Sequence, residues 1–197
     1  MAQGQQEART AFGFLFFCVA LAVSAGAVIS ELAYLASAEL YVYAIIWLAS
    51  FGAVFGGAYP KFRKVGSSIK RRMKGSANWG LGAKSLNAVC WAGPFLAIPV
   101  FPALYQYLIL VGIGLGNLST YLMIKRFNHS DNREQLVVAS VSLASIPVAL
   151  VIDTTIFAAS QDIAVMLSRI LIAASYAAGG IFAYSGSTGT ATQQLNH

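Results

Sequence analysis

Long apolar blocks alternate with short polar segments along this chain. A helix that crosses the hydrocarbon layer of a bilayer, about 30 Å thick, needs roughly 20 predominantly apolar residues. The pattern therefore predicts an all-α protein, a polytopic membrane bundle with six transmembrane helices at residues 11–30, 40–58, 85–101, 103–124, 136–158 and 163–184.

The third and fourth of these helices come from one apolar tract, residues 85–124, which is too long for a single span. Pro94, Pro99 and Pro102 lie in its first half. Because proline interrupts the hydrogen bonding of a helix, we expect a turn at residues 99–103 and a short helix before it.

Basic residues indicate how the helices are oriented. They precede the first helix and lie between the second and third and between the fourth and fifth: Arg9, Lys61, Arg63, Lys64, Lys70, Arg71, Arg72, Lys74, Lys84, Lys125, Arg126 and Arg133. The other turns carry Glu31, Glu39 and Asp162 but no Lys or Arg. Since positively charged loops remain in the cytoplasm, we expect three hairpins with both ends inside, in the plasma membrane.

The composition agrees with a lipid environment. Hydrophobic residues make up 57% of the 197 and charged residues 10%, whereas a soluble domain carries about 25% charged residues. The formal net charge of +6 comes from basic residues between apolar blocks. That placement favours contact with anionic lipid headgroups over binding of nucleic acid.

The two ends of the chain raise separate questions. Residues 11–27 resemble the apolar region of a signal peptide, with a small-residue cleavage sequence at 22–25, but Glu7 beside Arg9 leaves little net charge before them. We therefore favour a spanning helix and a single transmembrane domain over residues 1–184. Residues 185–197 are small and polar, which predicts a disordered cytoplasmic tail.

Residues that commonly carry catalysis are sparse. The two histidines, His129 and His197, lie in a loop and at the last position, away from any second candidate base or nucleophile. Cys18 and Cys90 lie inside apolar blocks without zinc-binding or disulfide spacing. We expect no enzymatic activity, no metal and no cofactor.

Two opposite charges lie within the last predicted hairpin. With a turn centred on Gln161, Asp153 and Arg169 each lie eight residues from it, about 12 Å along their helices. A lone charge in a spanning helix costs about 2.5–3.5 kcal/mol, so we predict an Asp153–Arg169 ion pair. It would mark a substrate or proton site or act as a structural clasp. The polar candidates to line such a site are Ser142, Ser145, Thr154 and Tyr176.

Other residues predict contacts between helices. Asn87 and Asn117 each lie fifteen residues from a turn near Pro102, so we expect a hydrogen bond between them. Small residues spaced by four positions allow helices to approach closely in lipid. Such pairs are Ala22 with Gly26, Gly52 with Gly56, and Gly112 with Gly116.

The segment 59–84 is a second candidate site. Its basic residues could bind anionic lipid headgroups or an acidic protein partner: Lys61, Arg63, Lys64, Lys70, Arg71, Arg72 and Lys74. Apolar residues at helical spacing predict a short helix on the inner leaflet: Phe62, Val65, Ile69 and Met73.

Three functional hypotheses follow. The absent chemistry and the packing motifs favour a non-catalytic accessory subunit that assembles with other membrane subunits. The polar pair Asp153 and Arg169 favours a small transporter or channel for a solute or an ion. The basic segment would be the output surface of a membrane sensor.

Overall fold

The computed structural model describes residues 2–74, 79–128 and 132–194, and within these ranges it is helical without any strand. Its six α-helices are α1 (Ala2–Leu35), α2 (Leu40–Lys74), α3 (Leu81–Ala97), α4 (Tyr105–Asn128), α5 (Arg133–Val151) and α6 (Gln161–Gln194). A 3₁₀ turn, Pro102–Leu104, precedes α4, and a π-helical segment, Ile152–Ile156, continues α5.

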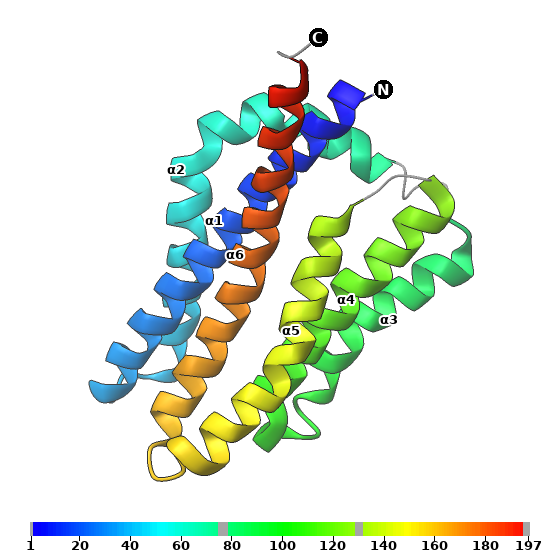
Figure 1. Cartoon of the computed structure of the whole chain (residues 1–197). Coiled ribbons are helices and arrows are strands. Elements are labelled where there is room, and N and C mark those ends of the chain that lie inside the picture. Colours follow the sequence, from blue (N-terminus) through cyan, green and yellow to red (C-terminus); the bar gives the residue numbers. More distant parts are fainter. Residues whose placement is uncertain (1, 75–78, 129–131, 195–197) are drawn as a thin grey trace.

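The helices pack in the order α2–α1–α6–α5–α4–α3 (Figure 1). Among the described elements, the backbone of α2 lies next to α1 alone and that of α3 next to α4 alone, although side chains of α2 such as Trp47 reach farther into the bundle. Figure 1 shows that α1 begins and α6 ends at the same end of the bundle. Two groups of three helices, α1, α2, α6 and α3, α4, α5, therefore meet mainly along α5 and α6.

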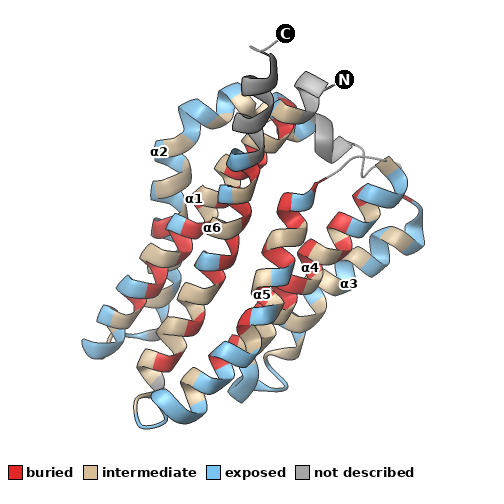
Figure 2. Cartoon of the chain, viewed as in Figure 1, coloured by how far each residue is buried: buried red, intermediate tan, exposed pale blue. Residues whose placement is uncertain are grey.

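The core lies where these two groups meet, and exposed side chains cover the outer faces (Figure 2). It consists of apolar side chains from α1, α4, α5 and α6: Phe12, Phe16, Ala20, Val23, Leu110, Ile113, Val138, Ala149, Ile172, Ala173 and Tyr176. The outer faces carry large apolar groups such as Leu48 and Leu81, 75% and 83% exposed. Apolar groups on the outside suit lipid better than water.

Five helices are long and apolar enough to cross a membrane: α1, α2, α4, α5 and α6. The sixth, α3, has 17 residues and none of them is buried. It corresponds to the short helix expected from the proline-rich half of the tract, and the turn that follows it includes Pro99 and Pro102.

Two predicted boundaries differ from the structure. The second helix does not end at Ala58 but continues to Lys74 with Pro60 inside it. The predicted disordered tail begins within α6, which is helical as far as Gln194. Both extensions contain polar residues, glycine and serine, which predict a loop when they are considered by themselves. A helix that has already formed can nevertheless propagate through such weak helix formers.

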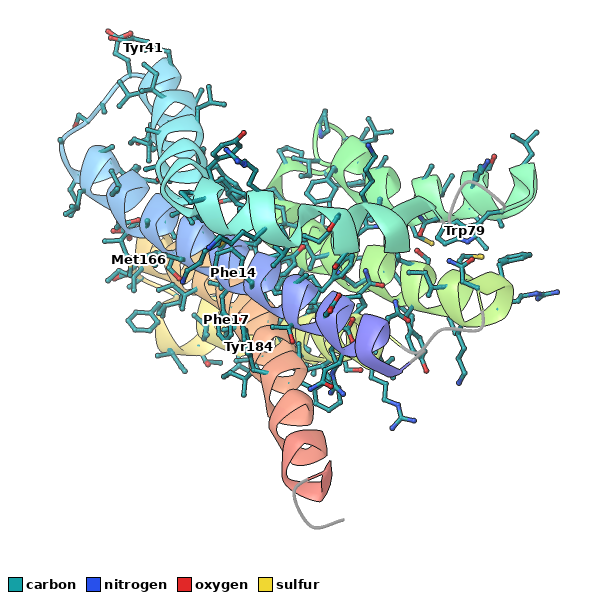
Figure 3. The ribbon with its side chains drawn as sticks, turned by 90° about the horizontal axis from the view of Figure 1, so that it is seen from above. Phe14, Phe17, Tyr41, Trp79, Met166 and Tyr184 are labelled. Atoms are coloured by element: carbon teal, nitrogen blue, oxygen red, sulfur yellow. The ribbon has the colours of Figure 1, made fainter. Side chains whose placement is uncertain are left out.

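The last part of α2 runs across the end of the bundle (Figures 1 and 3). Proline removes one backbone hydrogen bond and bends a helix, so Pro60 accounts for a change in direction. The Phe62 ring lies 5.0 Å from the Phe14 ring of α1, between ring centroids. Phe62 of the predicted leaflet-facing surface therefore packs against α1.

Candidate functional site

The π-helical segment shapes the polar region at the end of α5. A π turn contains more residues than an α turn, so its side chains lie on different faces from those of a regular α-helix. The Thr154 and Thr155 hydroxyls donate to the carbonyl oxygens of Leu150 and Val151, at 2.8 and 2.6 Å. These bonds occupy carbonyl oxygens beside the segment that contains Asp153.

The side chain of Asp153 receives a hydrogen bond from a residue of α4. The Tyr107 hydroxyl donates to Oδ2 of Asp153 at 2.5 Å, and the Gln106 side chain interacts with the same hydroxyl. Gln106 is only 5% exposed. Oδ1 of Asp153 and Oε1 of Gln106 are both buried and receive no hydrogen bond from the described residues.

Arg169 lies among different partners. Its guanidinium is 6.0 Å from the centroid of the Trp47 ring on α2, and it interacts with the Tyr105 hydroxyl. It also interacts electrostatically with Glu31 of α1, which in turn interacts with Asp162. Three helices besides α6 therefore surround this cation.

The predicted ion pair between Asp153 and Arg169 is not formed. Asp153 has Tyr107 as its hydrogen-bond partner, and its second oxygen has none among the described residues. Tyr105 interacts electrostatically with both charges, so they belong to one region of the molecule. Equal spacing from the turn gives two residues the same depth but not the same direction around their helix axes, and a π-helical segment alters that direction.

Sequence reasoning missed the tyrosines and glutamine of this region. Tyr105, Gln106 and Tyr107 are consecutive residues at the start of α4. Three polar groups inside an apolar tract were the available signal, because a spanning helix rarely buries such groups without partners.

The predicted lining residues do not form one polar surface. Ser142 is fully buried and donates to the Leu110 carbonyl oxygen of α4 at 2.9 Å, so it connects two helices. Ser145 donates to Val141 of its own helix. Thr154 is exposed and is bonded to its own helix, and Tyr176 is buried in the core, where it interacts with Asn117.

The predicted Asn87–Asn117 hydrogen bond is replaced by other contacts. Asn117 donates to the Ile113 carbonyl oxygen and interacts with Tyr176. Oδ1 of Asn87 lies 2.8 and 3.0 Å from the hydroxyl oxygens of Ser119 and Thr120. A polar connection between α3 and α4 therefore exists, but it uses a different face of α4.

The basic part of α2 lines two cavities. One, of about 600 Å³, is lined by residues of α1 and α2: Gln6, Glu7, Thr10, Lys64, Val65, Ser67 and Ser68. The other, of about 430 Å³, is lined by Tyr59, Pro60, Arg63 and Lys64. Lys61 lies 5.5 Å from the Phe14 ring centroid, and Lys70 is exposed.

Anion binding by this segment stays a prediction. The carboxylate of Glu7 lies on the larger cavity with Lys64, so that cavity carries both signs of charge. The side chains of Arg71, Arg72, Met73 and Lys74 lie outside the part of the chain described in this detail.

Comparisons with protein-family models, curated proteins and solved structures find no match to this chain.

Proposed function

We propose that this chain is a non-catalytic subunit of a larger complex in the plasma membrane, crossing it six times with both ends in the cytoplasm. The helical, apolar character of the bundle supports integration into a membrane. The orientation rests on charge. Basic residues occur near the start of α1, in the last part of α2, at the start of α3 and at the end of α4.

One observation supports a subunit role above the alternatives. At Gly52, Gly56 and Gly57 of α2, no described atom other than the adjoining residues and the nearby backbone of α2 itself lies within 4 Å of the position that a Cβ would occupy. The other predicted small-residue pairs are used inside the fold. A Cβ at Gly26 would meet Trp47, and one at Gly112 or Gly116 would meet Phe95 or Trp91. The glycines of α2 are therefore free to contact a helix outside this chain.

The chemistry of this surface favours a transmembrane helix as the occupant. Glycine in a helix costs about 0.5–1 kcal/mol relative to alanine, and the contacts within this chain do not offset that cost at α2. Flexible lipid tails gain nothing specific from exposed backbone, whereas a second helix gains close packing. Ile45 and Leu48, both exposed, supply apolar contact area beside the glycines.

Purification from native membranes tests the proposal. Tagged wild-type protein in mild detergent should co-purify with a distinct membrane protein. The double variant Gly52→Leu with Gly56→Leu should recover about tenfold less of it, which corresponds to 1.4 kcal/mol. The matched control is Ala88→Leu with Ala92→Leu, which enlarges two exposed positions of α3 and should retain the partner.

Two results would contradict the subunit role. The first is a wild-type protein that purifies alone or only with copies of itself. The second is equal recovery of the partner with both double variants, provided that both variants melt at the wild-type temperature.

Ion transport is a second candidate function, favoured by the polar region around Asp153. The two buried acceptor oxygens there have no donor among the described residues. Intramembrane ionisable groups with such surroundings mark ion pathways in many membrane proteins. A water-accessible route to Asp153, detected by modification of a cysteine placed there, would favour transport over a purely structural contact.

A further inference from the structure

The region between α4 and the π-helical segment contains two buried acceptor oxygens that receive no hydrogen bond from the described residues. The Tyr107 hydroxyl supplies its single proton to Oδ2 of Asp153. Oδ1 of Asp153 and Oε1 of Gln106 remain buried without a hydrogen bond from the described residues. Buried acceptors without a partner are costly, so a positive group or a donor from outside the chain would stabilise them.

The two oxygens belong to one connected group. Gln106 interacts through its amide with the Tyr107 hydroxyl, and that hydroxyl binds the Asp153 carboxylate. Only 5% of the Gln106 surface is exposed, whereas Asp153 is partly exposed. A ligand that reaches the carboxylate would therefore enter a group that also contains the buried amide of Gln106.

The charge of the group favours a cation. Asp153 carries one negative charge, and the nearby Arg169 is occupied by Trp47, Tyr105 and Glu31. Carboxylate, amide and phenol oxygens are hard ligands that suit alkali and alkaline-earth ions. Calcium takes six to eight oxygens and magnesium demands an octahedral set, so one carboxylate with two neutral oxygens suits a single charge better.

We propose that Asp153, Gln106 and Tyr107 form a binding site for a monovalent metal cation, Na⁺ or K⁺, between α4 and Ile152–Ile156. The π-helical segment contributes by directing Asp153 toward α4, and such segments occur frequently at functional sites. This site does not depend on the proposed subunit role. It lies on α4 and the π-helical segment after α5, whereas the glycines proposed to contact a partner helix lie on α2.

Thermal unfolding of the full-length protein in detergent tests the site directly. Tryptophan fluorescence would report melting in NaCl, KCl or choline chloride at constant ionic strength. Na⁺ or K⁺ should raise the melting temperature by several degrees in a saturable way, because a ligand that binds the folded state stabilises it. The comparison of the two salts identifies the preferred ion.

Variants separate this site from a general salt effect. Asp153→Asn should abolish the response to the cation, and Gln106→Leu should raise the half-saturating concentration about tenfold or more. Asp162→Asn, which removes a carboxylate from the start of α6, should respond as the wild type does. If Asp153→Asn does not fold, the cation response of Gln106→Leu tests the site instead. Leucine removes the unpaired amide oxygen and has nearly the same side-chain volume as glutamine.

Equal melting temperatures in the three salts would overturn the proposal and indicate that water or a proton satisfies the two oxygens. An unchanged cation response in Gln106→Leu would also overturn it.

Discussion

Tyr107 is the residue that connects two helices in the polar region. Its hydroxyl reaches from α4 to the carboxylate of Asp153, which belongs to the end of α5. A hydrogen bond to a charged group contributes about 1.5–3 kcal/mol, more than a bond between neutral groups. A single oxygen atom therefore accounts for a measurable part of the stability of this end of the bundle.

Replacing Tyr107 by phenylalanine should lower the free energy of unfolding by about 1.5–3 kcal/mol, because both carboxylate oxygens of Asp153 would then lack a donor among the described residues. Thermal melting in detergent measures the loss. Tyr59→Phe is the matched control, since Tyr59 is 62% exposed on α2 and should tolerate the change. Equal melting temperatures for the two variants would show that the hydroxyl of Tyr107 contributes little.

At this scale the sequence identified the important charges but not their partners. Asp153 and Arg169 attract attention because charge is rare in an apolar block. Their contacts depend on the direction in which each side chain leaves its helix axis. The π-helical segment changes that direction locally, and no residue type in the sequence predicts such a segment. The same limit explains why Asn87 binds Ser119 and Thr120 in place of Asn117.

At the scale of the helices, glycines mark where backbones approach one another. Gly179 of α6 lies against α5, where an added Cβ would come 3.0 Å from the Glu134 carbonyl oxygen and would also meet Val138. A backbone oxygen inside α5 cannot rotate away as a side chain can. Gly52 of α2 has no such neighbour.

The two glycines should therefore respond in opposite directions to alanine. Gly179→Ala should destabilise the protein by about 1–3 kcal/mol through overpacking. Gly52→Ala should be neutral or stabilise the isolated protein by up to about 1 kcal/mol, because alanine is the better helix former. Melting temperatures of the purified variants give both values, and a loss of similar size at Gly52 would show that α2 already packs against something there.

The positions of the helices were more accessible to sequence reasoning than their ends. Each of the six apolar blocks overlaps one helix of the structure, since block length reflects the thickness of the bilayer. The spacing of Phe62, Val65 and Ile69 predicted a helix in this segment. The glycine and serines among them obscured the fact that this helix continues the predicted transmembrane helix 40–58.

For the molecule as a whole, the distribution of charge predicts a testable orientation. In a protein without Cys18 and Cys90, Ala36→Cys between α1 and α2 and Ser160→Cys before α6 should react with an impermeant maleimide added to intact cells. Ser67→Cys in the basic part of α2 should react only after permeabilisation, because positively charged segments stay in the cytoplasm. Labelling of Ser67→Cys in intact cells, or protection of Ser160→Cys, would refute the proposed topology.

The packing order has a geometric consequence for the chain between α2 and α3. These two helices are consecutive in sequence yet occupy opposite edges of the row, so the connection between them must cover the width of the protein. Residues 60–74, about 22 Å of helix at 1.5 Å per residue, run along this path across the end of the bundle. The length of this segment has to match the separation of the outer edges, which follows from the four helices packed between them. Adding or removing one turn would therefore shift the α3 side relative to the α1 side, and it would also displace Ile69, whose side chain packs against the core.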